Sequence, residues 1–127
     1  MAEILFTGRE LDVMAVLWSQ GASTVAEVRE RLDDDLAYTT VLTVLRTLES
    51  KGHVSHASDG KAHRYAPCVD RDEAGRSALG RIVEKIFGGS RELLLTQLVD
   101  GRPIDDAELK RLRKVLNERL RESGSPR

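Results

Sequence analysis

Apolar residues recur at helical spacing in three short segments of the N-terminal half of the chain. They are Leu11, Met14, Leu17 and Trp18 in the first segment, Val25, Val28 and Leu32 in the second, and Val41, Val44, Leu45 and Leu48 in the third. The spacing predicts helices over about 8–19 and 37–51, with a short helix between them. The first two begin with Thr-x-x-Glu capping boxes, and Gly52 follows the third, where a helix C-terminus favours a left-handed residue.

A strand-like alternation of polarity follows the third predicted helix. Residues 53–57 alternate, residues 58–61 contain the Asp-Gly turn signal, and residues 62–66 are predicted to be a returning strand that Pro67 stops. Three short helices followed by a β-hairpin are the order of a winged helix-turn-helix. The sequence therefore predicts a mainly α fold with a small β-hairpin, in which residues 1–68 form a winged-helix DNA-binding domain.

The polar face of the third helix is unusual for a helix that only meets water. At about 100° per residue, short hydroxyl side chains and one Arg lie opposite the apolar stripe: Thr39, Thr43, Arg46, Thr47 and Ser50. Such side chains suit close approach to phosphates and base edges in a major groove. The alternative is a half-buried helix whose Thr hydroxyls bond back to the backbone.

The hairpin that follows is locally basic, because Lys51, Lys61 and Arg64 lie close in the sequence to all three histidines. Together with the third helix it gives the predicted DNA-binding residues, which are Tyr38, Thr39, Thr40, Thr43, Arg46, Thr47, Lys51, Lys61, His63 and Arg64. The three histidines, His53, His56 and His63, also raise the alternative of a zinc site, but they lack a fourth ligand. We therefore expect no metal and no cofactor.

Apolar stripes continue in the C-terminal half, after residues 69–74, which are predicted to be a linker. Helices are expected at about 75–87, 91–99 and 105–121. Their apolar positions include Leu79, Ile82, Val83, Ile86, Phe87, Leu94, Leu98, Leu109, Leu112 and Leu116. Three short helices cannot bury all of these residues alone. We expect residues 69–127 to be a homodimerisation region, and the alternative is a monomeric core shared with the N-terminal half.

Composition and charge narrow the classes of function. The 127 residues are 40% hydrophobic and 32% charged, as in a folded helix-rich protein. No apolar run approaches the roughly 18 residues of a membrane span, and the N-terminus lacks a signal-peptide pattern, so we expect a cytoplasmic protein with no membrane insertion. One cysteine, Cys68, allows no internal disulfide. Residues 1–67 carry seven Lys and Arg against ten Asp and Glu, a net charge of −3 that bulk electrostatics does not reconcile with DNA.

Two other classes of function compete with DNA binding. The acidic N-terminal half would suit a protein–protein adaptor that uses a winged helix as a scaffold. An enzyme has less support, because the sequence contains no nucleophile with a base, and no pair of carboxylates, at a spacing typical of a catalytic site. We therefore expect a DNA-binding protein that is not an enzyme.

Specific segments of the chain resemble the BlaI/MecI-type penicillinase repressors over almost its whole length. They are Leu11-x-x-Met14-x-x-Leu17-Trp18, the run from Ala37 to Gly52 that contains Tyr38-Thr39-Thr40-Val41 and Lys51-Gly52, and Tyr65-Ala66-Pro67 at the end of the hairpin. The resemblance implies a homodimer that binds palindromic operator DNA and blocks transcription, in a β-lactam or cell-envelope stress response.

The resemblance also implies a sensor protease as a partner. In the β-lactam-responsive members of the family, a membrane metalloprotease sensor triggers cleavage of the repressor at an Asn-Phe pair. Gln97-Leu98 stands in that neighbourhood here, which departs from the family pattern. Copper-responsive CopY-type relatives carry Cys-x-Cys pairs near the C-terminus, and the single cysteine of this chain argues against copper sensing.

Overall fold

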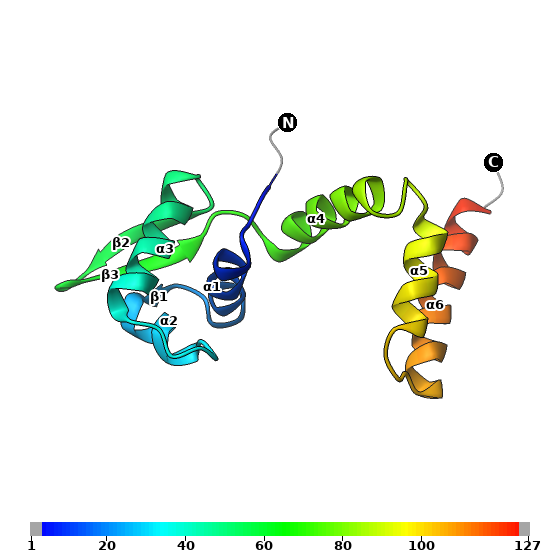
Figure 1. The fold of residues 1–127 in the computed structure, drawn as a ribbon, viewed down its shortest axis with the longest axis horizontal. Coiled ribbons are helices and arrows are strands. Elements are labelled where there is room, and N and C mark those ends of the chain that lie inside the picture. Colours follow the sequence, from blue (N-terminus) through cyan, green and yellow to red (C-terminus); the bar gives the residue numbers. More distant parts are fainter. Residues whose placement is uncertain (1–3, 125–127) are drawn as a thin grey trace. The chain divides into compact units, whose positions relative to one another are not determined.

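The chain divides into two compact units, residues 1–80 and 81–127. The computed structural model describes residues 4–124. The first unit contains α1 (Gly8–Gln20), β1 (Ser23–Thr24), α2 (Val25–Arg31), α3 (Tyr38–Ser50), β2 (Val54–Asp59), β3 (Ala62–Pro67) and most of α4 (Arg71–Lys85), as Figure 1 shows. The second contains the end of α4, α5 (Arg91–Asp100) and α6 (Asp106–Ser123). This mainly helical order with one small sheet confirms the predicted fold class.

The core of the first unit lies among α1, α2 and α3. Its largest fully buried side chains are Val13, Met14 and Leu17 from α1, Val28 from α2, and Val41, Leu45 and Leu48 from α3. The apolar faces predicted for α2 and α3 are therefore confirmed. The stripe predicted for α1 is wrong at Leu11, which is 44% exposed. A helix turns about 100° per residue, and the buried member of this turn is the preceding residue, Glu10.

Local sequence signals fix where the helices begin and end. Thr7 and Thr24 form complete capping boxes with Glu10 and Glu27, as predicted. Asp105 caps α6 by accepting from the backbone N–H of Glu108. Beyond the C-cap of α3, Gly52 has φ +83°, the left-handed conformation that a glycine adopts without strain.

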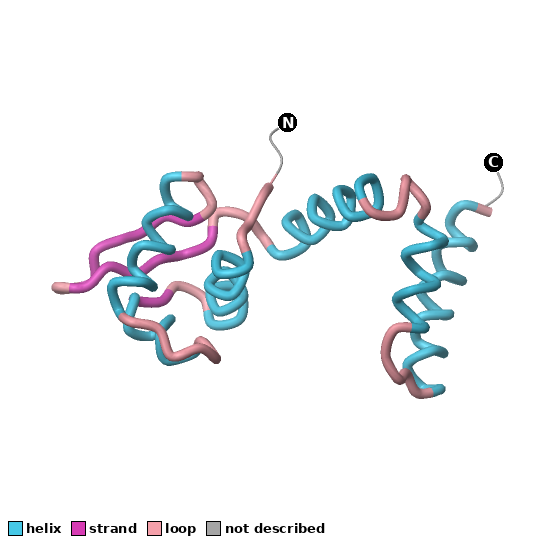
Figure 2. The backbone as a smooth tube through the Cα atoms, viewed as in Figure 1, coloured by secondary structure: helices cyan, strands magenta, loops and turns pink. Residues whose placement is uncertain are grey.

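The hairpin belongs to a three-stranded antiparallel sheet in the order β1-β3-β2. The strands β2 and β3 pair from Val54 opposite Pro67 to Asp59 opposite Ala62, so the loop has two residues. Its first residue, Gly60, has φ +62°, as the first central residue of a type II′ turn requires. The two-residue strand β1 was not predicted, because a strand this short has no visible alternation. It pairs Ser23 with Tyr65 and Thr24 with Arg64, and Figure 2 shows the three strands together.

Residues 69–74 are part of the first unit, so the prediction of a linker there is wrong. Val69 and Ala74 are buried in the core. The indole Nε1–H of Trp18 donates to the carbonyl oxygen of Val69 at 2.9 Å, and the backbone N–H of Ile4 donates to Ser77 Oγ at 3.3 Å. The first unit therefore ends at Gly80, inside α4, and not at residue 68 as predicted.

The second unit has no buried side chain on either of its complete helices. Ser90 caps α5, and α5 and α6 run in opposite directions on either side of the loop at 101–105 (Figure 1). Neither helix contains a residue that a single chain buries. The apolar side chains of this unit are therefore half-buried or exposed in one copy of the chain.

Candidate nucleic-acid interface

One face of α3 is exposed and polar, opposite the buried Val41, Leu45 and Leu48. The exposed side chains of this face are Thr39, Thr40, Thr43, Arg46 and Thr47, with Tyr38 48% exposed at the first turn. Thr43 Oγ1 donates to the carbonyl oxygen of Thr39 at 2.9 Å, so one hydroxyl does bond back to the backbone. The face as a whole is nevertheless exposed, which rules out the half-buried helix.

The start of α3 leaves backbone donors free of side-chain caps. The residue before the helix is Ala37, which has no side-chain oxygen, and no side-chain cap hydrogen bond is present. The first N–H groups of a helix point outward and carry the positive end of its dipole. An uncapped N-terminus beside a row of hydroxyls suits a phosphate oxygen.

The wing, which we define as residues 54–67, lies against α3. Between them is a cleft of about 270 Å³ lined on the α3 side by Tyr38, Leu42, Arg46 and Glu49. The wing and its surroundings line it with His56, Lys61, Ala62, His63, Tyr65 and Val25. The predicted Arg46, Lys61 and His63 therefore come together in space, although the sequence separates them.

Two residues of this cleft, His56 and Glu49, were missing from the predicted site. Nδ1 of His56 lies 2.6 Å from Glu49 Oε2, and the His56 ring stacks edge-on against His63 with centroids 4.5 Å apart. Alternation along the hairpin signalled that these two histidines share a face. Burial raises the pKa of the Tyr65 phenol, and the carboxylate of Glu49 adds to this, so the hydroxyl keeps its proton.

The side chain of Lys51 does not join this surface, although it was predicted to bind DNA. Its Nζ donates to both carboxylate oxygens of Glu10, at 3.0 and 2.9 Å. Glu10 is 4% exposed, and it also accepts from the backbone N–H of Thr7 at 2.8 Å. Burial by itself raises the pKa of Glu10, but the hydrogen bonds from Lys51 and Thr7 outweigh it, so the pKa lies below the ordinary value. Lys51 thus ties the end of α3 to α1.

The side chain of Arg64 also has protein partners, because it pairs with Glu27 and Asp59. It lies on the strand position beside His63, and successive side chains of a strand point to opposite faces. Of the three wing residues predicted to contact DNA, Lys61 and His63 therefore line the cleft with α3, and Arg64 does not.

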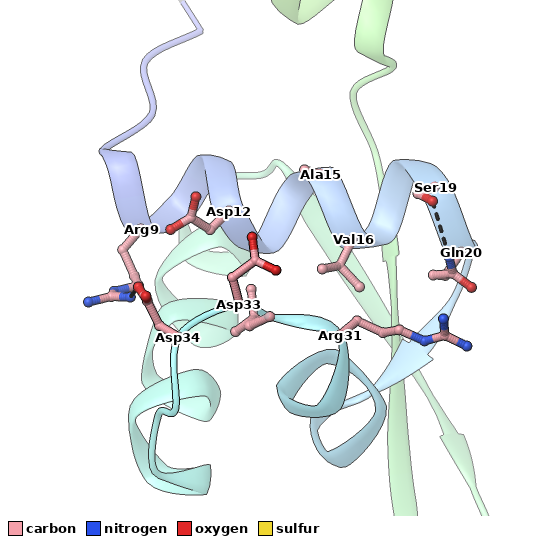
Figure 3. Close-up of a pocket in the computed structure, with 10 residues that line it drawn as sticks. Arg9, Asp12, Ala15, Val16, Ser19, Gln20, Arg31, Asp33 and Asp34 are labelled. Atoms are coloured by element: carbon pink, nitrogen blue, oxygen red, sulfur yellow. Dashed lines mark hydrogen bonds and ion pairs between the residues drawn. The ribbon is translucent and has the colours of Figure 1, made fainter.

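Three acidic residues of the first unit line a groove apart from the cleft between α3 and the wing. Asp12, Asp33 and Asp34 line an open groove of about 500 Å³ between α1 and the α2–α3 turn, where Figure 3 shows Asp12 and Asp33 on opposite sides. Asp34 is paired with Arg9 at 2.7 Å. None of the predicted DNA-binding residues lines this groove. These three carboxylates count toward the net charge of the unit but lie outside the cleft that Arg46, Lys61 and His63 line.

Other kinds of site find little support in the part of the chain that the structure describes. Within residues 4–124 no group of three or more His, Cys, Asp or Glu side chains is arranged to hold a metal ion. His53 packs on Phe6 with centroids 4.9 Å apart, while His56 and His63 lie at the wing. Cys68 is free and exposed, not buried. No helix among the described residues combines the length and hydrophobicity needed to cross a membrane.

The predicted dimerisation residues fall into two groups by exposure. Val83, Phe87, Leu94 and Leu112 are half-buried within one chain. Leu79, Ile82, Ile86, Leu98, Leu109 and Leu116 are exposed, and so are Val115 and Leu120. The second group leaves apolar surface on α4, α5 and α6 that a single chain does not cover.

Known proteins share this fold and sequence over most of the chain. The family model described as penicillinase repressor matches residues 6–118. The transcriptional regulator BlaI of Mycobacterium tuberculosis is 40% identical over 116 residues, which cover 86% of this chain and 80% of that protein. The penicillinase repressor of Bacillus licheniformis is 22% identical over 111 residues, covering 86% and 87% of the two chains.

A solved structure agrees with the first unit. The solution structure of the DNA-binding domain of the repressor BlaI superposes with a TM-score of 0.50 and 29% identity, covering 57% of this chain and 93% of that one. These relatives are regulators and not enzymes. The chain therefore belongs to the penicillinase repressor family and is a DNA-binding transcriptional repressor.

Proposed function

We propose that the protein binds a two-fold symmetric operator as a homodimer, with α3 of each copy in the major groove. The carrying observation is the exposed face of α3, where Thr39, Thr40, Thr43 and Thr47 flank Arg46. In a helix-turn-helix the second helix reads base edges, and a bidentate Arg on guanine is the commonest specific contact. Arg46 is therefore the proposed base-reading residue, and the threonines contact phosphates or thymine methyl groups.

The wing contributes backbone contacts in this proposal. Lys61 stands in the two-residue loop at the hairpin tip, and His63 follows one residue into β3. Both line the cleft with Arg46, so a strand of DNA that meets α3 also passes these side chains. Lys is a compact point charge that suits phosphate and not a particular base. Lys61 should accordingly add affinity on all sequences alike.

A second copy of the chain is the proposed partner of the second unit. Ile86, Leu98, Leu116 and Leu120 are 48–70% exposed, and α5 and α6 bury no residue in one chain. Each such side chain contributes roughly 1.5–3 kcal/mol when it is fully buried, so several of them can hold a stable dimer. A two-fold axis also presents two copies of α3 to two half-sites one helical turn or a multiple of it apart.

Cleavage by a sensor protease stays outside the proposal. The residues in the neighbourhood of the family's Asn-Phe pair are Gln97 and Leu98, on the last turns of α5, and the pair itself is absent.

Selection and titration test the proposed function. Genomic DNA fragments that the purified protein retains are sequenced, and the palindrome recovered is titrated against a scrambled duplex of equal length. We expect affinity for the palindrome to exceed that for the scramble and to fall steeply between about 50 and 200 mM salt. Sedimentation of the protein–DNA complex should give two chains per duplex. Equal, salt-independent affinity for both duplexes would contradict DNA recognition by α3 and the wing.

A further inference from the structure

The two faces of the wing have different surroundings. In the β2–β3 register, His56 lies opposite Tyr65, and Ala57 lies opposite Arg64. Side chains alternate between the faces of a sheet, so Arg64 lies on the face away from the His56, His63 and Tyr65 cluster. On that other face its cross-strand neighbour is Thr24 of β1.

The guanidinium of Arg64 joins three separate segments. Its Nε donates to Asp59 Oδ2 at 2.6 Å, at the end of β2. Its Nη1 donates to Glu27 Oε1 in α2 at 2.8 Å, and to the carbonyl oxygen of Ala22 in the α1–β1 connection at 3.4 Å. An Arg presents its donors as a rigid fork, whereas a Lys ammonium is a compact point charge on a flexible stem.

The carboxylate of Glu27 is itself held in place. The same Oε1 accepts from the backbone N–H of Thr24 at 2.9 Å, and Thr24 Oγ1 accepts from Glu27 N–H at 3.2 Å. The hydrogen bond from the Thr24 backbone, and next to it that from Arg64, hold the pKa of Glu27 below its ordinary value. Bonds to Asp59 and then Glu27 raise the pKa of Arg64. The anchor on α2 thus stays ionised near neutral pH.

On its other face the wing is joined to α3, where His56 Nδ1 lies 2.6 Å from Glu49 Oε2, but its tip extends beyond the third strand. The third strand β1 pairs only with Tyr65 and Arg64, so residues 58–63 form a two-stranded ribbon beyond it. An isolated two-stranded hairpin is marginally stable in water. The Arg64 guanidinium binds Asp59 in this ribbon and Glu27 in α2, which is the first helix of the helix-turn-helix. The loop that carries Lys61 begins one residue after Asp59.

We propose that Arg64 is a positioning residue, which fixes the wing against α2 through Glu27 and Asp59 and thereby sets where Lys61 meets the DNA. The inference rests on the proposed function, and it replaces the sequence-based prediction that Arg64 contacts DNA. Without the Glu27–Arg64–Asp59 bridge, the wing samples several orientations, and ordering it on the operator costs binding free energy.

The substitution Glu27→Gln distinguishes a positioning Arg from a phosphate contact. Gln at the third helical position keeps the capping box of α2. The substitution removes the negative charge that pairs with Arg64, and residue 27 itself contacts no DNA whether Arg64 positions the wing or binds phosphate. If Arg64 positions the wing, Glu27→Gln weakens operator binding by about three- to tenfold, the scale of a networked surface ion pair. If Arg64 binds phosphate, Glu27→Gln frees a cation for the DNA and strengthens binding.

The dependence on salt gives a second readout, with Lys61→Gln as the matched control in the same hairpin. Each phosphate contact contributes about 0.9 to the slope of log affinity against log salt. Arg64→Gln should weaken operator binding without changing the slope, whereas Lys61→Gln should lower the slope by about one. A slope lowered by about one in Arg64→Gln would overturn the positioning role.

All of these titrations use the full chain, the selected palindrome and a scrambled duplex of equal length. A double variant completes the experiment. Arg64→Gln combined with Glu27→Gln should lose no more than either change alone, because both break one bridge. Losses that add would mean independent roles and would overturn the inference. Failure of the proposed function looks different, since wild type and Lys61→Gln would then both bind without salt dependence. Trp18 fluorescence in urea verifies that each variant is folded.

Discussion

Replacing Lys51 by Met should destabilise the first unit and leave the DNA contacts unchanged. The ammonium of Lys51 lies 2.9 Å from Glu10 Oε2. Glu10 belongs to the first turn of α1 and is 4% exposed. Met keeps most of the apolar stem of Lys51 but removes both hydrogen bonds. The Glu10 carboxylate then keeps Thr7 as its partner at a buried position.

The expected loss lies between two limits. Removing one partner of a fully buried ion pair costs about 3–5 kcal/mol, and an exposed pair contributes about 0–1 kcal/mol. The side chain of Lys51 is 40% exposed, so water reaches this pair from one side and replaces part of the lost interaction. We therefore expect Lys51→Met to lower the free energy of unfolding by about 2 kcal/mol, within the range for hydrogen bonds to charged groups.

Urea unfolding followed by the fluorescence of Trp18 measures this loss, because Trp18 is the only tryptophan and lies in the first unit. Glu10→Gln removes the charge that needs Lys51 and retains the capping box. The double variant should therefore be more stable than Lys51→Met alone, and the double-mutant cycle should give a coupling of about 1–2 kcal/mol. A Lys51→Met protein with wild-type stability and a salt slope lowered by about one would refute this reasoning and restore Lys51 as a phosphate contact.

Three further results are expected. Arg46→Ala should cost roughly 1–3 kcal/mol in binding to the selected palindrome and relax its preference at one base, measured by titration against single-base variants of that duplex. Leu116→Asp should sediment as a monomer and bind the palindrome weakly, because it places a charge in the proposed interface, while Asn117→Asp, an exposed control on α6, should remain a dimer. The stability that Glu10 adds over Glu10→Gln should be full above the ordinary pKa of 4.5 and vanish as the pH falls through the lower pKa of the folded state, measured by urea unfolding between about pH 6 and pH 3.

Local sequence signals determined most of the secondary structure of this protein. The capping boxes at Thr7 and Thr24 and the left-handed Gly52 locate helix ends because their hydrogen bonds and dihedral angles involve only residues a few positions apart. The apolar stripe of α3 likewise predicted both its buried face and the exposed threonines. A two-residue strand and a buried Val69 carry no such signal, since each is defined only by partners elsewhere in the chain.

The roles of the charged side chains were decided only by the tertiary structure. Lys51, Lys61 and Arg64 look alike in the sequence as basic residues near a recognition helix. Glu10 lies 41 positions before Lys51, and Glu27 lies 37 positions before Arg64. No local sequence pattern predicts these two ion pairs, because the packing of α1 and α2 against α3 and the wing brings each carboxylate within 3 Å of its cation. An ion pair depends on distance in space, so only the fold shows that Lys51 and Arg64 pair with carboxylates while Lys61 lines the cleft with Arg46.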